Sequence, residues 1–156
     1  MRRLLALVAL LALTALQAAA AERLSGEAIK RAFDGNTVSG RYTNGGFFTE
    51  YHDPNGQALG HNGWQPNTDA CWTTRADDVC DYYGPQTDRT VHCFTVELSD
   101  RLYVLRNTSN RQINALATVE PGNPRRHSDG GQPWYCDGLI SKAPEPPMSR
   151  RRLAGR

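Results

Sequence analysis

The sequence predicts a small, mainly β domain, in which an antiparallel meander closes into a barrel or sandwich with one short N-terminal helix and two disulfides. Three observations carry this prediction. Short segments of alternating hydrophobicity recur about every 8–12 residues between clusters of turn residues, as in all-β domains. An apolar leader opens the chain, and all four cysteines follow it, which is typical of an exported, disulfide-bonded domain.

The predicted helix covers residues 24–34. Ser25 suits the N-cap position, and Ile29 and Phe33 fall on one apolar stripe. Gly35 follows the stripe and is typical of a helix end. A helix this short is not stable alone, so we expect its apolar stripe to dock on the sheet.

The strands are predicted from alternation and from the turn sequences between them. NGG (44–46) and DPNG (53–56) are strong turn signals. Gly40 and Gly60 lie inside strands, where glycine often marks a bend that lets a sheet close. The predicted strands are 37–42, 47–52, 57–61, 70–75, 79–83, 90–98, 101–105 and 112–120.

The cysteines are predicted to pair through the register of two strands. Placing Cys80 opposite Cys93 leaves residues 84–89 as the connection and gathers the apolar side chains of both strands on the other face. We therefore predict a Cys80–Cys93 disulfide, which leaves Cys71 to pair with Cys136. The spacing lacks the close cysteine pair of a zinc site, so we predict no metal there.

The next hairpin is predicted to turn at residues 99–100. Its register would set Leu98 opposite Arg101 and Val96 opposite Tyr103. This arrangement gathers the large apolar side chains on one face, whereas a slip by one residue would scatter them over both faces.

The two ends of the chain differ from its middle. Residues 1–21 have the arginine-containing start, the apolar run and the small residues of a secretory signal peptide. We expect a disulfide-stapled β domain over 22–142 and a disordered basic tail over 143–156, which is rich in proline and arginine. The expected location is periplasmic or secreted, with no transmembrane segment after cleavage of the signal peptide.

Charge argues against a nucleic-acid partner. Six of the 18 lysines and arginines and one of the 16 aspartates and glutamates (Glu145) lie in the leader and the tail, which leaves 12 basic against 15 acidic residues. The predicted domain is therefore acidic, and acidic surfaces repel phosphate backbones.

Several motifs are similar to those of a group of small secreted bacterial proteins of unknown function. They are GNTVSG (35–40), GGFFTEYHDPNGQALG (45–60), ACW (70–72), CF (93–94), GNP (122–124) and the pattern SDGGxxWxCDG (128–138). The resemblance covers most of the chain after the leader. It implies an exported bacterial β domain, and it carries over no catalytic residue.

Five residues are candidates for ligand binding: Trp64, Trp72, Trp134, Asp81 and His92. Exposed tryptophans at a barrel mouth would suit stacking on a sugar or an apolar ligand. Alternatively, Trp72 and Trp134 pack beside the Cys71–Cys136 disulfide. Asp81 and His92, opposite each other in the predicted register, form either a structural charge pair or a functional acid–histidine pair.

No motif of a known catalytic or cofactor site occurs in the chain, so we predict no catalytic residue, no cofactor and no metal. The four histidines lack metal-site spacing. Carboxylates are plentiful, and a hydrolase would need two of them across a cleft. They include Glu50, Asp53, Asp69, Asp77, Asp78, Asp81, Glu97, Asp129 and Asp137.

We therefore expect a monomeric, non-catalytic module that binds a small ligand, an envelope polymer or a partner protein. The alternative is a small envelope hydrolase that uses carboxylates or the Asp81–His92 pair, and a third is a purely structural envelope protein. A concave pocket that clusters carboxylates or histidines with shifted pKa values would favour the hydrolase. A flat apolar patch or a tryptophan-lined mouth would favour binding.

Overall fold

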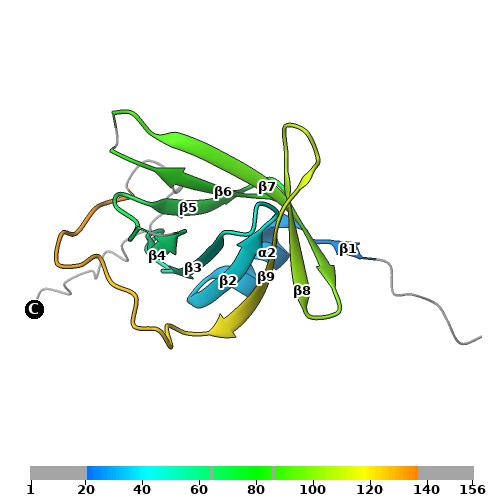
Figure 1. The fold of residues 1–156 in the computed structure, drawn as a ribbon, viewed down its shortest axis with the longest axis horizontal. Coiled ribbons are helices and arrows are strands. Elements are labelled where there is room, and N and C mark those ends of the chain that lie inside the picture. The colour runs from blue at the N-terminus through cyan, green and yellow to red at the C-terminus, as the bar shows by residue number, and fades with distance from the viewer. Residues whose placement is uncertain (1–20, 64, 86, 137–156) are drawn as a thin grey trace, which may run out of the picture.

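The computed structural model describes residues 21–63, 65–85 and 87–136. Figure 1 shows them as one sheet that curls round on itself, with a helix against it. Trp64, the predicted tail and all but the last residue of the predicted signal peptide lie outside the described residues. Within the described ranges, no helix is long and apolar enough to cross a membrane.

The sheet is antiparallel throughout, and its strands follow the order β4-β3-β2-β9-β8-β7-β6-β5, with β1 paired to β7. Most neighbours in the sheet are neighbours in sequence, which is the meander that the turn spacing predicts. The strands are β1 (Glu22–Arg23), β2 (Asn36–Tyr42), β3 (Phe47–His52), β4 (Ala58–Asn62), β5 (Cys71–Arg75), β6 (Asp78–Tyr83), β7 (Thr90–Ser99), β8 (Leu102–Asn107) and β9 (Ile113–Pro121).

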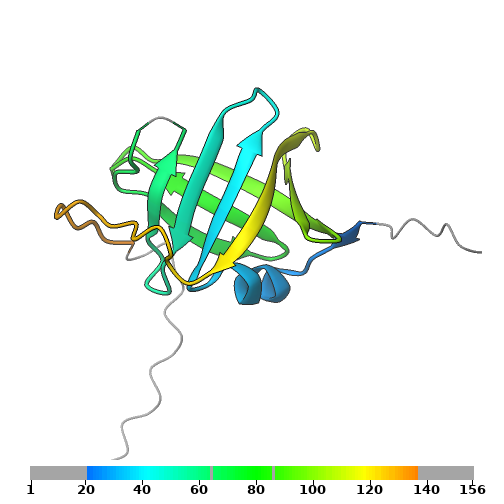
Figure 2. The same cartoon turned by 60° about the horizontal axis from the view of Figure 1, so that its bottom comes forward.

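The two outermost strands of this order, β4 and β5, meet at their starts and nearly close the sheet into a barrel (Figure 2). Ala58 donates its backbone N–H to the carbonyl of Ala70 at 2.9 Å, and Trp72 donates to Gly56 at 2.8 Å. This contact is called the seam below. The predicted mainly β fold is therefore confirmed as a nearly closed antiparallel barrel.

The helix α2 (Gly26–Phe33) lies across one end of the barrel (Figure 2). The Ser25 hydroxyl caps it by accepting the backbone N–H of Ala28 at 3.3 Å. Ile29 and Phe33 are fully buried among side chains of the barrel interior. The predicted helix, its cap and its apolar stripe are thus confirmed, and α2 seals this end of the barrel.

The barrel interior is filled by side chains that alternate along each strand, because successive residues of a strand face opposite sides. Apolar side chains predominate there, and they form one cluster with the stripe of α2. The buried members of this cluster are Ile29, Phe33, Val38, Phe48, Ala58, Ala70, Trp72, Val79, Phe94, Val96, Leu105, Ala115 and Ala117.

Both predicted disulfides are confirmed. Cys80 lies opposite Cys93 in the ladder of β6 and β7 and is bonded to it. Cys71 is bonded to Cys136, which ties the chain beyond β9 to the start of β5. Trp134 packs beside this second disulfide, in a smaller cluster outside the main core.

The predicted register of the β7–β8 hairpin is wrong by two residues. Leu98 lies opposite Tyr103, and the turn is formed by Asp100 and Arg101 instead of residues 99–100. Asp100 adopts a left-handed φ of 57°, which aspartate tolerates better than most residues. A shift by two residues keeps every side chain on its own face, so the hydrophobic pattern could not distinguish the two registers.

The two disulfides are expected to contribute unequally to stability. The Cys71–Cys136 bond closes a separation of 65 residues and the Cys80–Cys93 bond one of 13. On chain entropy alone, replacing the long-range pair by alanine should cost about 4 kcal/mol and the short-range pair about 3 kcal/mol. Urea unfolding of the two double variants measures the difference. An equal or larger loss for the Cys80→Ala/Cys93→Ala variant would contradict this ranking.

Candidate functional site

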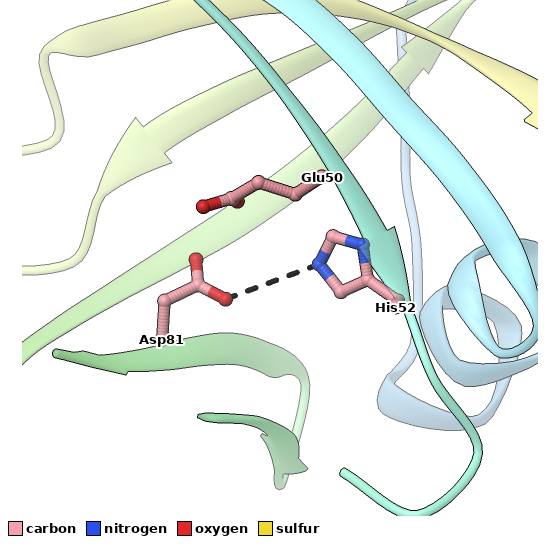
Figure 3. A group of neighbouring side chains, drawn as sticks. All are labelled: Glu50, His52 and Asp81. Carbon is pink, nitrogen blue, oxygen red and sulfur yellow. Dashed lines mark ion pairs between the residues drawn. The ribbon is translucent and has the colours of Figure 1, made fainter. Parts of the chain in front are cut away.

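Two strands on opposite sides of the barrel place polar side chains in its interior. Glu50 and His52 lie on the inward face of β3 with Phe48, and Asp81 and Tyr83 lie on the inward face of β6. Figure 3 shows Glu50, His52 and Asp81 pointing toward one another from these strands. Each of the three offers one nitrogen or oxygen atom that could ligate a metal ion, and these atoms lie within 4.8 Å of one another. We call these three residues the interior cluster.

Glu50 is held in place by two hydrogen-bond donors. Its Oε1 accepts the Tyr83 hydroxyl at 2.8 Å and the Asn67 side-chain amide at 2.7 Å. The same Asn67 amide also donates to the carbonyl of Ala58, at 3.1 Å. Asn67 reaches the cluster from the segment between β4 and β5, so a loop residue completes an interior site.

His52 and Asp81 face each other without a hydrogen bond. His52 Nε2 lies 3.9 Å from Asp81 Oδ1, and their side chains are only 4% and 9% exposed. Within the described residues, Asp81 Oδ1 and His52 Nδ1 have no hydrogen-bond partner. The His52 ring packs edge-on against Trp72, with ring centres 4.8 Å apart, and also contacts Phe33. The imidazole is therefore enclosed by aromatic rings.

Burial shifts the titration of every member of the cluster, because a charge is poorly stabilised away from water. Burial raises the pKa of Glu50, and burial together with the Glu50 charge raises the pKa of Asp81 well above its ordinary value. Burial lowers the pKa of His52 to about 4. His52 is thus neutral at pH 7, and its contact with Asp81 is not an ion pair there.

Above the cluster, a pocket of about 210 Å³ opens at the end of the barrel opposite α2. Glu50, Asp81 and Tyr83 form its polar floor. Its apolar walls are Phe48, Phe94 and Leu105, and its rim carries Tyr42, Asn44, Asn62, His92 and Asn114. The pocket therefore combines an apolar body with a few convergent polar groups, as small-molecule sites do.

Gly40 makes room for one of the pocket walls. A Cβ at Gly40 would lie 2.8 Å from atoms of the Phe48 ring and 2.5 Å from the Leu116 carbonyl oxygen. The bare backbone of β2 thus lets Phe48 pack directly over it. The glycine expected to mark a bend also allows this close approach.

The tryptophans among the predicted ligand-binding residues do not line this pocket. Trp72 is buried in the core and donates its indole N–H to the carbonyl of Asp53 at 3.0 Å. Trp134 is buried beside the Cys71–Cys136 disulfide and donates to the carbonyl of Ala70 at 2.7 Å. Trp64 lies outside the described residues.

Asp81 and His92 do come together, opposite each other in the ladder and both lining the pocket. Asp81 is on the buried floor, whereas His92 is exposed at the rim. Among the described residues, the imidazole that forms a close contact with Asp81 is His52 and not His92. The histidine paired with Asp81 is therefore His52 of β3, and not His92 as the sequence suggested.

Sequence reasoning named Glu50 only as one of nine carboxylates, and it did not name His52, Tyr83 or Asn67 as site residues. One signal was present: Glu50 and His52 alternate with Phe48, on the face that carries an apolar side chain. Two ionisable residues on a core face are unusual, because burying them is costly. No comparable signal in the sequence marks Asn67 as a hydrogen-bond donor to Glu50. Its position depends on how the loop between β4 and β5 folds back toward the barrel interior.

Replacing Asp81 by asparagine is expected to stabilise the protein at neutral and alkaline pH by about 1–3 kcal/mol, because the amide does not bury the negative charge that the ionised carboxylate buries without a hydrogen bond to its Oδ1. The folded state raises the pKa of Asp81, so it favours the protonated carboxyl. The penalty is absent below the unfolded-state pKa of about 3.9 and grows as pH rises toward the folded-state pKa. Urea unfolding from pH 4 to pH 8 in chelator-containing buffer measures the gain.

The matched control is Asp88→Asn, which changes an exposed aspartate and should leave stability nearly unchanged. A gain from Asp81→Asn that did not depend on pH would contradict the burial of a titrating carboxyl at this position.

Comparisons with protein-family models, with curated proteins and with solved structures found no match for this chain. The fold and the interior cluster therefore supply the argument about function. They describe a disulfide-bonded β-barrel with two buried carboxyl groups and a neutral imidazole beneath an open pocket.

Proposed function

We propose that the protein is a non-catalytic, exported module that binds a small molecule in the pocket at the open end of its barrel. One observation carries this proposal: Glu50, Asp81 and Tyr83 converge on the floor of a pocket with apolar walls. Two disulfides and a signal-peptide-like leader support an oxidising, extracytoplasmic location.

The size of the pocket limits the ligand. About 210 Å³ is less than the roughly 300–1,000 Å³ of pockets that hold drug-sized molecules. The ligand would therefore be small, with an apolar part against Phe94 and Leu105 and a polar end on the floor. Asn44, Asn62 and Asn114 at the rim supply amide groups that can donate and accept hydrogen bonds there.

A second candidate is the hydrolase, favoured by the two clustered carboxyl groups with raised pKa values. A carboxyl group with a raised pKa can act as a general acid near neutral pH. Glu50 and Asp81, however, are only 3% and 7% exposed. An envelope polymer needs an open cleft to reach its catalytic groups, so binding of a small molecule agrees better with this enclosure.

Turnover separates the two candidates. Purified protein should leave envelope polysaccharide and peptide substrates intact. Hydrolysis that is lost in Asp81→Asn or His92→Ala would exclude the non-catalytic proposal and favour the hydrolase.

Blocking the pocket mouth is expected to abolish ligand binding. His92→Trp places a large ring at the rim, whereas Val91→Trp, the matched control, adds the same ring to an exposed neighbour that does not line the pocket. Ligands found by NMR screening of small molecules against the native protein should lose binding in His92→Trp and keep it in Val91→Trp. Equal retention in both variants would place binding outside the pocket.

A further inference from the structure

The interior cluster holds two acidic groups without a basic partner. Among the described residues, no lysine or arginine forms an ion pair with Glu50 or Asp81. Their one imidazole neighbour among these residues, His52, approaches Asp81 Oδ1 to 3.9 Å without forming a hydrogen bond. Buried carboxylates are stable only when they are protonated, paired with a cation or bound to a metal. The two carboxylates therefore lack a compensating positive charge among the described residues, and a bound cation could supply it.

A second, independent observation points to the same place. Asp81 Oδ1 is a buried acceptor that receives no hydrogen bond from any residue the structure describes, on a side chain that is only 9% exposed. Figure 3 shows it directed at His52 Nε2. Asp81 Oδ1 and His52 Nε2 lie 3.9 Å apart. Each atom can give a lone pair to a metal ion placed between them.

We propose that Glu50, His52 and Asp81 bind a divalent first-row transition-metal ion, such as Zn²⁺, at the floor of the barrel pocket. This inference goes beyond the binding of a small organic molecule and does not depend on it. A donor set of one imidazole and two carboxylates suits Zn²⁺ and its neighbours in the first row, whereas Mg²⁺ and Ca²⁺ prefer oxygen donors alone.

The spacing of the donors fits with a small adjustment. A tetrahedral ion with bonds of about 2.0–2.2 Å holds its donors about 3.4 Å apart. The donors of the interior cluster lie within 4.8 Å of one another, so they must approach by up to about 1.4 Å. Rotation of the Asp81 side chain can supply a movement of this size without moving the strands, because its Oδ1 has no hydrogen bond to break within the described residues.

The surroundings of Glu50 resemble those of a metal-binding carboxylate. Tyr83 and Asn67 donate to its Oε1, which leaves Oε2 for an ion. Outer hydrogen bonds of this kind orient ligands and are part of most metal sites. The adjoining pocket also gives water, or a donor atom of a bound molecule, access to the remaining coordination position.

Metal binding can be tested directly on the purified protein. After removal of metal with a chelator, calorimetric titration with Zn²⁺ should give one site per chain, and Zn²⁺ should raise the midpoint of thermal unfolding. Asp81→Asn and His52→Gln should each weaken binding by about tenfold or more and remove the thermal shift. Asp81→Asn is expected to be at least as stable as the native protein without metal, so its loss of binding would not reflect misfolding.

Surface histidines are the main source of adventitious zinc binding, and the chain offers a matched control. His61 and His127 have ring centres 6.2 Å apart beside a separate surface depression. The double variant His61→Gln/His127→Gln should keep the single site and its thermal shift. X-ray absorption of the zinc-loaded protein should report oxygen and nitrogen donors, including one imidazole, and no sulfur, since the four cysteines are in disulfides.

Two results would overturn the proposal. One is the absence of stoichiometric Zn²⁺ binding to folded protein, which would leave shared protons as the means by which Glu50 and Asp81 are neutralised. The other is binding that survives Asp81→Asn and His52→Gln but is lost in His61→Gln/His127→Gln. Neither result bears on the pocket ligand, which the His92→Trp and Val91→Trp pair tests separately.

Discussion

The seam between β4 and β5 is the constraint on which the rest of the structure depends. Few backbone hydrogen bonds join the two strands there, and Trp134 reinforces them from outside. Its indole donates to Ala70 before β5, and its carbonyl accepts the side-chain amide of Gln57 before β4 at 2.6 Å. The Cys71–Cys136 disulfide holds Trp134 in this position. Closure at the seam leaves the carboxyl groups of the interior cluster buried, and this burial raises their pKa values.

Much of the fold could be predicted because its signals are local. The Ser25 cap, the turn sequences and the joint placement of Cys80 with Cys93 each depend on a short stretch of chain, and the structure confirms them. The β7–β8 register could not be fixed, because two registers that differ by two residues bury the same face. The local conformation of Asp100 selects between them.

The candidate site was harder to predict for a physical reason. Asp81 could be placed on the core face from the register of β6, but its partners Glu50 and His52 come from β3, across the barrel. Only closure of the sheet brings these strands face to face, and alternation along one strand does not report which strand lies opposite. The tryptophans were candidates for exposed ligand-stacking residues at the barrel mouth. Trp72 and Trp134 are instead buried beside the seam.

Asn67 connects the interior of the protein to its outside. Its side chain donates to Glu50 within the barrel, and its backbone N–H donates to the carbonyl of Gly60 at 2.7 Å. The residue also lines the surface depression beside His61. An occupant of the pocket that binds Oε2 of Glu50 would therefore share this carboxylate with Asn67, which donates to Oε1. The position of Glu50 inside the barrel is thus tied, through one hydrogen bond, to the conformation of the loop between β4 and β5 on the surface.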